Sequence, residues 1–219
     1  MNTRKEAENY YKKFSKLKGN EHIANLFAIE KLLDIVKFNR PNKILEIGLG
    51  IGSISYSIID YLSKKEDKFV YFGTEANEFC LEELPKNLGN HYSRLNLFSS
   101  LDHIDTSNKF DLIIIDGSDN SIEKIQNLIT EYGVVFIEGD RKNQQTLLRK
   151  AFPKHLFVHT VSNYREPEYG PFTTGNWSGG GKLIYINPTF RQRLNWIMEK
   201  FKSSFRNRVT RRIHSSYLR

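Results

Sequence analysis

The stretch Leu45-Glu46-Ile47-Gly48-Leu49-Gly50-Ile51-Gly52-Ser53 decides the fold. The short apolar segment 43–47 predicts a strand, and residues 51–63 predict the helix that follows. Glycines at alternate positions between them permit a tight turn and let backbone amides approach a ligand at the positive end of that helix. A purely structural turn and a dinucleotide site are the alternatives, and the dinucleotide fingerprint requires a third glycine at position 53, where Ser53 stands.

Outward from this loop, predicted strands and helices alternate along the chain. The strands 112–115 (LIII) and 134–137 (VVFI) are continuously apolar, which is typical of a parallel sheet covered on both faces. We expect a helix over 4–38 and further helices over 78–88, 121–130 and 143–152, with strands over 69–72, 95–98, 156–161 and 183–186. The long connection 162–182 has no helical period and predicts antiparallel pairing of the last two strands, which gives a three-layer α/β sandwich with a seven-stranded, mostly parallel sheet and an antiparallel edge.

Composition separates a neutral body from a basic tail. The chain has 219 residues and a net charge of +8, yet residues 1–190 hold 24 basic and 24 acidic residues. The last 29 residues hold nine basic residues against Glu199 alone. We therefore expect an N-terminal helical segment (1–42), a central domain (43–190) and a C-terminal helix (191–219). The single cysteine excludes an internal disulfide, and the polar N-terminus without a long apolar run predicts a cytoplasmic protein.

The glycine loop and two later acids resemble the class I S-adenosylmethionine-dependent methyltransferases, which have a Rossmann-like fold. Motif I of that family, E/D-x-G-x-G-x-G, is matched by Glu46, Gly48, Gly50 and Gly52. Glu75 ends the second strand, and Asp116 ends the fourth strand in Phe110–Gly117. The resemblance implies S-adenosylmethionine as cofactor, with Glu46 near its methionine part, Glu75 on its ribose hydroxyls and Asp116 over the active site.

Carboxylates after the fourth and fifth strands are the candidates for chemistry. Asp116 and Asp119 follow the fourth strand, and Glu138 and Asp140 follow the fifth, so both pairs are expected at the carboxyl edge of the sheet. Asp116 and Asp119 could take a proton from an acceptor hydroxyl. The set Asp116, Glu138 and Asp140 resembles the Mg²⁺ ligands of metal-dependent O-methyltransferases. Alternatively, Glu138 and Asp140 cap the helix that begins near Lys142.

The acceptor is predicted to be a hydroxyl of a small molecule or glycan. Tyr164 and Trp177, in the 162–182 connection, could stack on a sugar or aromatic ring, or pack on the sheet edge. The Asn-Pro-Pro-aromatic signature of amino-directed methyltransferases does not follow the fourth strand, which favours oxygen, and the chain resembles small-molecule and sugar O-methyltransferases. Two alternatives stay open: an RNA methyltransferase that uses the basic tail on phosphates, and a cofactor-binding domain without catalysis.

The tail predicts a basic amphipathic helix. Apolar residues recur at three- and four-residue spacing between arginines and lysines, at Leu194, Ile197, Met198, Phe201, Phe205, Val209 and Ile213. Such a helix could pack on its own domain or on a second copy in a homodimer, lie on an anionic membrane surface such as the inner membrane, or contact RNA. The neutral body makes a nucleic-acid partner the least favoured of these.

Overall fold

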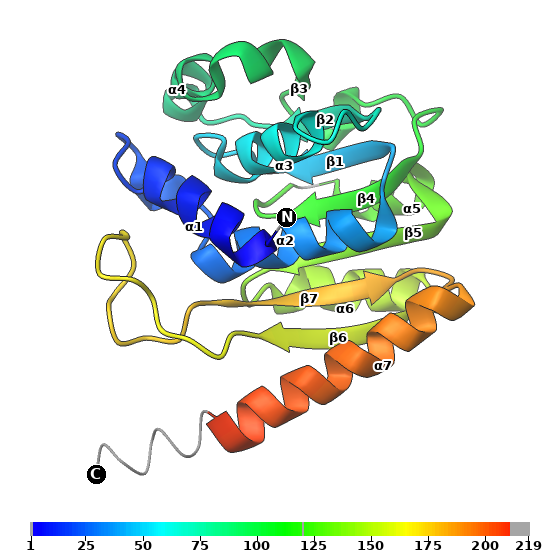
Figure 1. Cartoon of the computed structure of the whole chain (residues 1–219). Helices are drawn as coiled ribbons and strands as arrows, with labels where there is room; N and C mark the ends of the chain where they lie inside the picture. Colours follow the sequence, from blue (N-terminus) through cyan, green and yellow to red (C-terminus); the bar gives the residue numbers. More distant parts are fainter. Residues whose placement is uncertain (1, 120, 211–219) are drawn as a thin grey trace.

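A seven-stranded mixed sheet forms the centre of the computed structural model, which describes residues 2–119 and 121–210 (Figure 1). The strand order is β3-β2-β1-β4-β5-β7-β6. The neighbours from β3 to β5 are parallel, whereas β7 is antiparallel to both β5 and β6. The predicted fold class is therefore confirmed. The strands are β1 (Lys43–Ile47), β2 (Val70–Thr74), β3 (Leu95–Phe98), β4 (Phe110–Ile115), β5 (Ile129–Glu138), β6 (Leu156–Val161) and β7 (Gly180–Tyr185).

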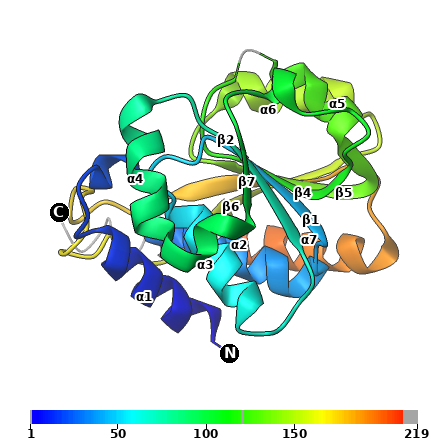
Figure 2. The same ribbon diagram turned by 90° about the horizontal axis from the view of Figure 1, so that it is seen from above.

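Helices cover both faces of the sheet (Figure 2). One face carries α1 (Thr3–Phe14), α2 (Leu26–Asn39), α3 (Ser53–Ser63), α4 (Glu78–Leu88) and α7 (Phe190–Phe205), and the other carries α5 (Ile125–Leu128) and α6 (Lys142–Ala151). Successive strand residues point to opposite faces, so Leu112 and Ile114 join the first core while Ile113 and Ile115 join the second. No described helix is long and apolar enough to cross a bilayer.

The single helix expected over 4–38 is wrong, because the chain turns between α1 and α2. Gly19 has φ +81°, and a Cβ there would lie 2.3 Å from the ring of Phe79. A one-turn 3₁₀ helix follows (η1, Asn20–His22), and Asn25 then caps α2 by accepting a hydrogen bond from the Ala28 N–H at 2.8 Å. The turn brings residues 21–25 to the carboxyl edge of the sheet.

Two other expected boundaries are wrong around the antiparallel edge. The helix expected over 121–130 is reduced to a 3₁₀ turn (η4, Ile122–Lys124) and α5, because Ile129 already pairs with Phe110 and opens β5. Strand β7 begins at Gly180, within the segment expected to be a connection. Gly181 lies against Phe136, whose ring would be 2.3 Å from an added Cβ, so this position requires glycine. Glycine is unfavourable in strands, and a strand is therefore not predicted there from the sequence.

Helix α7 is attached to the body through polar side chains. Thr189 and Gln192 form a capping box, and Gln192 Nε2 donates to the Tyr132 carbonyl at 3.0 Å. Trp196 Nε1 donates to the Phe157 carbonyl of β6 at 2.8 Å. The helix expected over 191–219 runs to Phe205 and continues as a π turn (η5, Arg206–Thr210); residues 211–219 lie outside the described part.

A buried ion pair adds to this attachment. Lys31 Nζ of α2 lies 2.5 Å from Glu199 Oε2 of α7, and the two side chains are only 9% and 10% exposed. Burial lowers the pKa of Lys31, against the charge of Glu199, which raises it. The pair therefore stabilises the α2–α7 contact only while both partners are present.

Removing one partner of this pair is expected to destabilise the protein. We expect Glu199→Leu to lower the free energy of unfolding by about 3–5 kcal/mol, because it leaves the Lys31 ammonium buried without its carboxylate. The double variant Lys31→Met/Glu199→Leu should recover most of the loss, measured by urea unfolding. Lys86→Met, which removes an exposed lysine from its pair with Glu83, is the control and should leave the free energy of unfolding close to that of the parent. Equal losses in Glu199→Leu and Lys86→Met would contradict the assignment.

Candidate functional site

A cavity of about 710 Å³ opens at the carboxyl edge of the sheet. Its walls come from the segments after β1, β2, β4 and β5, from residues 21–25, and from the connection between β6 and β7. Its volume is in the range of small-molecule sites, and its position is the one at which open α/β sheets bind ligands.

The glycine loop forms one wall of the cavity. Gly48, Gly50 and Gly52 have φ of +86°, +53° and +95°, and Gly48 and Gly50 line the cavity. A Cβ on Gly48 would lie 2.5 Å from the Gly117 backbone, and one on Gly50 would lie 2.4 Å from the His22 carbonyl oxygen. The loop therefore has its conformation and its close contacts only because these positions lack side chains.

Glu75 holds the glycine loop against the end of β2. Its Oε2 accepts a hydrogen bond from the Gly50 N–H at 2.7 Å, and its Oε1 accepts from the Ala76 and Asn77 N–H groups at 2.9 and 2.8 Å. The carboxylate also lines the cavity. The acid expected to contact a ribose is thus placed beside the loop.

Glu46 lies beneath the loop and is completely buried. The Tyr71 hydroxyl donates to Glu46 Oε2 at 2.6 Å, whereas Oε1 has no hydrogen-bond partner. Burial raises the pKa of Glu46 well above its usual value. A buried carboxyl oxygen without a partner is costly, and it marks a polar position that the protein alone does not satisfy.

Asp116 and Glu138 form a half-buried carboxyl pair at the cavity wall. Burial raises the pKa of Asp116 well above its usual value, and the charge of Glu138 raises it further, while Arg141 opposes both. Burial also raises the pKa of Glu138. Arg141 Nη2 lies 3.5 Å from Asp116 Oδ1, and Asn25 Nδ2 donates to Glu138 Oε1 at 2.5 Å. Two adjacent, partly desolvated carboxyls resist simultaneous ionisation, so this pair retains a proton to higher pH than exposed carboxyls do.

The structure does not assemble the expected Mg²⁺ ligands Asp116, Glu138 and Asp140. The Asp140 side chain is 70% exposed and lies outside the cavity lining, where it pairs with Lys182 Nζ at 3.1 Å and Lys142 Nζ at 3.6 Å. Arg141 already supplies positive charge beside Asp116. Within residues 2–119 and 121–210 no three acidic, histidine or cysteine side chains are grouped for a metal. The ligand set does not fit Mg²⁺, and the expectation of a metal site is corrected.

The helix-capping alternative for Glu138 and Asp140 does not hold either. Helix α6 begins at Lys142, and its N-cap residue is Arg141, with no side-chain hydrogen bond to the cap. Both carboxylates make other contacts: Glu138 with Asn25, and Asp140 with Lys182.

Asp119 lies in the cavity wall but is committed to the loop around it. Its two oxygens accept from the Leu101 N–H at 3.0 Å and the Ser121 N–H at 2.8 Å. These hydrogen bonds occupy both oxygens of the Asp119 carboxylate with backbone of the surrounding loops.

The two aromatic residues expected to contact the acceptor lie in different places. Trp177 lines the cavity, and the guanidinium of Arg165 lies 4.3 Å from the centre of its ring. Tyr164 lies outside the cavity lining, because its hydroxyl donates to Glu30 at 2.6 Å and Arg4 lies over its ring at 3.5 Å. Tyr164 therefore joins the connection to α1 and α2.

Among the cavity-lining residues that were not predicted from the sequence are Asn25, Arg141 and Glu166. Asn25 carries a detectable signal, since an Asn directly before an apolar helix predicts a cap and thus the helix start. Arg141 follows the acids after β5 but received no role. Glu166 lies in the connection before β7, where no local pattern indicates a site. Burial raises the pKa of Glu166, and its Oε2 has no hydrogen-bond partner.

The cavity is strongly acidic. Its lining has one lysine or arginine, Arg141, and six carboxyl groups: Glu21, Glu75, Asp116, Asp119, Glu138 and Glu166. Phe172 and Trp177 supply apolar surface at the wall formed by the β6–β7 connection.

Comparisons with known proteins bear on the fold. No protein-family model and no curated protein sequence matches the chain. A putative O-methyltransferase from Klebsiella pneumoniae and an O-methyltransferase from Bacillus cereus solved with S-adenosylhomocysteine each align with a TM-score of 0.59 at 15% identity, over 83% of this chain and 90% of theirs. A putative RNA methyltransferase from Pyrococcus horikoshii aligns with a TM-score of 0.58 at 12% identity, over 83% of this chain and 98% of its own.

These solved structures share the sheet and helix arrangement described above, although their names span O-methyl and RNA methyl transfer. The alignments extend over most of both chains, but the sequence identity is too low to indicate a substrate. The chain therefore has the Rossmann-like fold of the class I S-adenosylmethionine-dependent methyltransferases.

Proposed function

We propose that this protein transfers a methyl group from S-adenosylmethionine to a hydroxyl of a small molecule or glycan. The observation that carries the proposal is that the glycine loop, Glu75 and the Asp116–Glu138 pair open into one cavity. The residues fit the cofactor: the loop offers backbone without side chains, and Glu46 keeps a buried oxygen without a partner beneath it. Gly48, Gly50, Glu75 and Asp116 would hold it.

The bound cofactor supplies an activated methyl group, so the protein must align the acceptor and remove its proton. In this proposal the ionised member of the Asp116–Glu138 pair accepts the hydroxyl proton. Arg141 and Asn25 hold the two carboxyl groups in place, since each makes a contact with one of them. Trp177 and Phe172 offer flat surfaces on which a sugar or aromatic ring can lie.

The charge of the cavity favours a neutral or cationic acceptor over RNA. Six carboxyl groups against one arginine repel phosphates, and a nucleic-acid site requires the opposite balance. The RNA methyltransferase therefore stays the less favoured alternative.

The proposal is tested by calorimetric titration with S-adenosylhomocysteine, followed by measurement of S-adenosylhomocysteine release with acceptor panels. We expect binding, and turnover with neutral glycosides or phenols that stops when the reacting hydroxyl is replaced by hydrogen. Binding without turnover on any hydroxyl, amine or RNA acceptor would support the non-catalytic alternative. Absence of binding would reject the proposal as a whole.

Salt dependence separates the two catalytic alternatives. With a small-molecule acceptor, kcat/KM should change by less than about twofold between roughly 50 and 200 mM salt, because phosphate contacts are not involved. An RNA acceptor held by several lysines and arginines would lose affinity by about a thousandfold or more over the same range. A steep salt slope would contradict the small-molecule assignment.

A further inference from the structure

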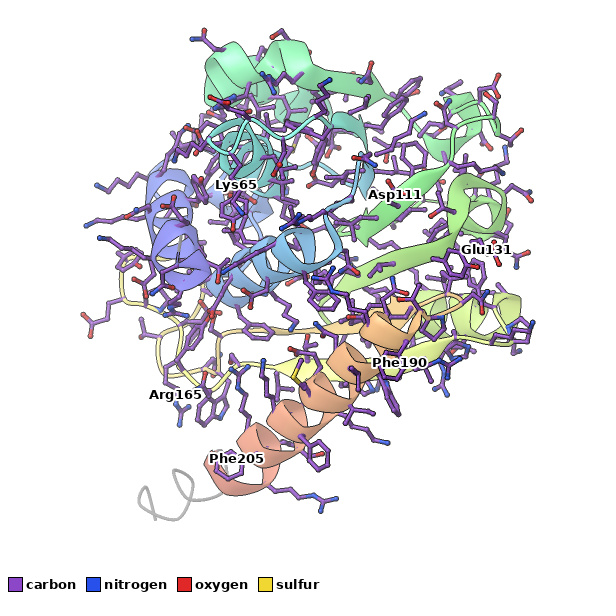
Figure 3. All side chains as sticks on the ribbon, turned by 45° about the vertical axis from the view of Figure 1, so that its right-hand side comes forward. Lys65, Asp111, Glu131, Arg165, Phe190 and Phe205 are labelled. Atoms are coloured by element: carbon purple, nitrogen blue, oxygen red, sulfur yellow. The ribbon has the colours of Figure 1, made fainter. Side chains whose placement is uncertain are left out.

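Helix α7 presents its apolar residues to solvent. Figure 3 labels Phe190 and Phe205 at its two ends. Six side chains, each between 41% and 77% exposed, form what we call the outer stripe: Phe190, Leu194, Ile197, Met198, Phe201 and Phe205. Their spacing of three, four or one residues places them along one side of the helix. The sequence left open that this stripe packs on its own domain. In the described part of the chain the stripe faces solvent instead.

The polar side of α7 faces the body and fixes the rotation of the helix. Gln192 and Glu199 are its buried residues, and both bond to the body, Gln192 to the Tyr132 carbonyl and Glu199 to Lys31. Trp196 and Asn195 on the same side bond to Phe157 and Tyr185. Turning the outer stripe inward would break all of these contacts, so the stripe is available to a partner.

Basic residues flank the outer stripe on both sides. At about 100° per residue, Arg193 and Lys200 lie to one side of Phe201, and Arg191 and Lys202 lie to the other. All four are exposed. The one acid between residues 190 and 208 is Glu199, which is buried on the opposite side. The exposed surface of α7 is therefore apolar along its centre and cationic at its edges.

We propose that α7 lies flat on an anionic lipid bilayer, with the outer stripe inserted at the level of the headgroups. An apolar stripe with lysines and arginines at its edges matches that surface in both polarity and charge. Long basic side chains can keep their charge at the headgroups while the stripe is buried. This inference is independent of the proposed methyl transfer.

Two other occupants fit the surface less well. A second copy of the chain, docked stripe to stripe, would bring the basic edges of two helices together with no exposed acid on either helix. Single-stranded RNA could use the cations and stack on the phenylalanines, but it leaves the aliphatic Leu194, Ile197 and Met198 without a role.

Membrane contact would place the cavity close to the bilayer. Arg206, at the end of α7, donates to the carbonyl of Val161, the last residue of β6. The helix thus ends at the same edge of the sheet as the connection that walls the cavity, as Figure 1 shows.

Vesicle flotation of the full chain tests the inference. We expect the protein to float with vesicles of phosphatidylcholine mixed with phosphatidylglycerol, and to stay behind with phosphatidylcholine alone. Phe201→Ser/Phe205→Ser should lower the partition coefficient by about tenfold for each phenylalanine. Arg193→Glu/Lys200→Glu should remove the preference for anionic vesicles. These residues are exposed, so the variants should unfold at the parent temperature, which circular dichroism checks.

Leu147→Ser is the matched control, because Leu147 is a 49% exposed apolar residue on α6, on the other face of the sheet. It should float as the parent does. Failure of the parent to bind anionic vesicles, or flotation unchanged in the phenylalanine variant, would overturn the proposal. A dimer in sedimentation velocity that the phenylalanine variant dissociates would assign the stripe to a second copy, and RNA binding lost in that variant would assign it to RNA.

Discussion

Asp116→Asn is expected to lower kcat by about two to four orders of magnitude, the usual contribution of a positioned proton acceptor. The asparagine keeps the size of the side chain and its place beside Arg141, but it cannot accept the acceptor's proton. Glu138→Gln should have a loss of the same order, because the two carboxyl groups act as one unit. Release of S-adenosylhomocysteine measures kcat, and calorimetric titration shows whether cofactor binding is kept.

The pH dependence follows from the raised pKa of Asp116. While both carboxyls of the pair are protonated neither can accept a proton, so kcat should rise with pH as the pair loses its first proton and one member becomes ionised. The free energy of unfolding should instead decrease as the pH rises. The folded pair binds protons more tightly than the unfolded chain, so its contribution is fully present at low pH and is lost as pH rises through the raised pKa values. Glu138→Gln should weaken the pH dependence of kcat and that of the free energy of unfolding.

Asp119→Asn identifies the proton acceptor. Asp119 accepts two backbone hydrogen bonds, so we expect its replacement to perturb the loop and to cost kcat about tenfold less than Asp116→Asn costs. If Asp119→Asn proved the more damaging of the two, or if kcat in Asp116→Asn kept its rise with pH, the carboxyl pair would not be the proton acceptor.

Gly50→Ala is expected to weaken binding of S-adenosylhomocysteine by about tenfold to a hundredfold. Gly50 has φ +53°, and an added Cβ would lie 2.4 Å from the His22 carbonyl oxygen. Either the glycine loop or residues 21–25 must move, and both line the cavity. Strain of this kind costs about 1–3 kcal/mol, which corresponds to the expected loss of affinity when the strained loop is itself part of the binding site.

Gly89→Ala is the matched control for this change. Gly89 has the same φ of +53°, but no atom lies within 4 Å of an added Cβ, and it does not line the cavity. It should lose some stability from the unfavourable φ and keep its affinity. Thermal unfolding of the two variants reports the backbone strain that both share. Calorimetric titration reports the displacement of cavity-lining residues, which is expected only in Gly50→Ala. Equal affinities in Gly50→Ala and Gly89→Ala would show that the glycine loop does not form the binding site.

The sequence predicted the centre of the sheet because the signals there are local. Ile113 and Val135 sit in continuously apolar runs, and Gly48 sits in a spaced motif, so a short window is sufficient to identify each. The break between α1 and α2 was missed although the Asn25 cap is a local signal for the start of α2, whereas the packing of Gly19 against Phe79, 60 positions away, has no local signal.

The carboxyl-rich side of the cavity was only partly predictable for a related reason. Asn25 contacts Glu138 across 113 positions of sequence, and Asp140 turns away because Lys182 of β7 lies beside it. Acids that follow neighbouring strands predict proximity, but which of them face inward depends on side chains from distant segments. The metal expectation failed at that step.

Amphipathicity located α7 but not its orientation. The stripe of Leu194, Phe201 and Phe205 shows that a helix forms, and the usual assumption turns such a stripe inward. Here Glu199 and Gln192 hold the polar side against the body through specific hydrogen bonds and an ion pair. The periodicity of apolar and polar residues defines two faces of a helix. It does not by itself specify which of the two faces packs against the rest of the chain.

The Lys31–Glu199 contact also limits how the C-terminal helix can be studied. Truncation before residue 191 would remove the Glu199 carboxylate from Lys31 and strip the cover from β6. A truncated protein that lost vesicle binding, or activity, would then report damage to the core as readily as loss of a docking element. Helix α7 is therefore not a detachable module, and its role has to be read from point substitutions on its outward side.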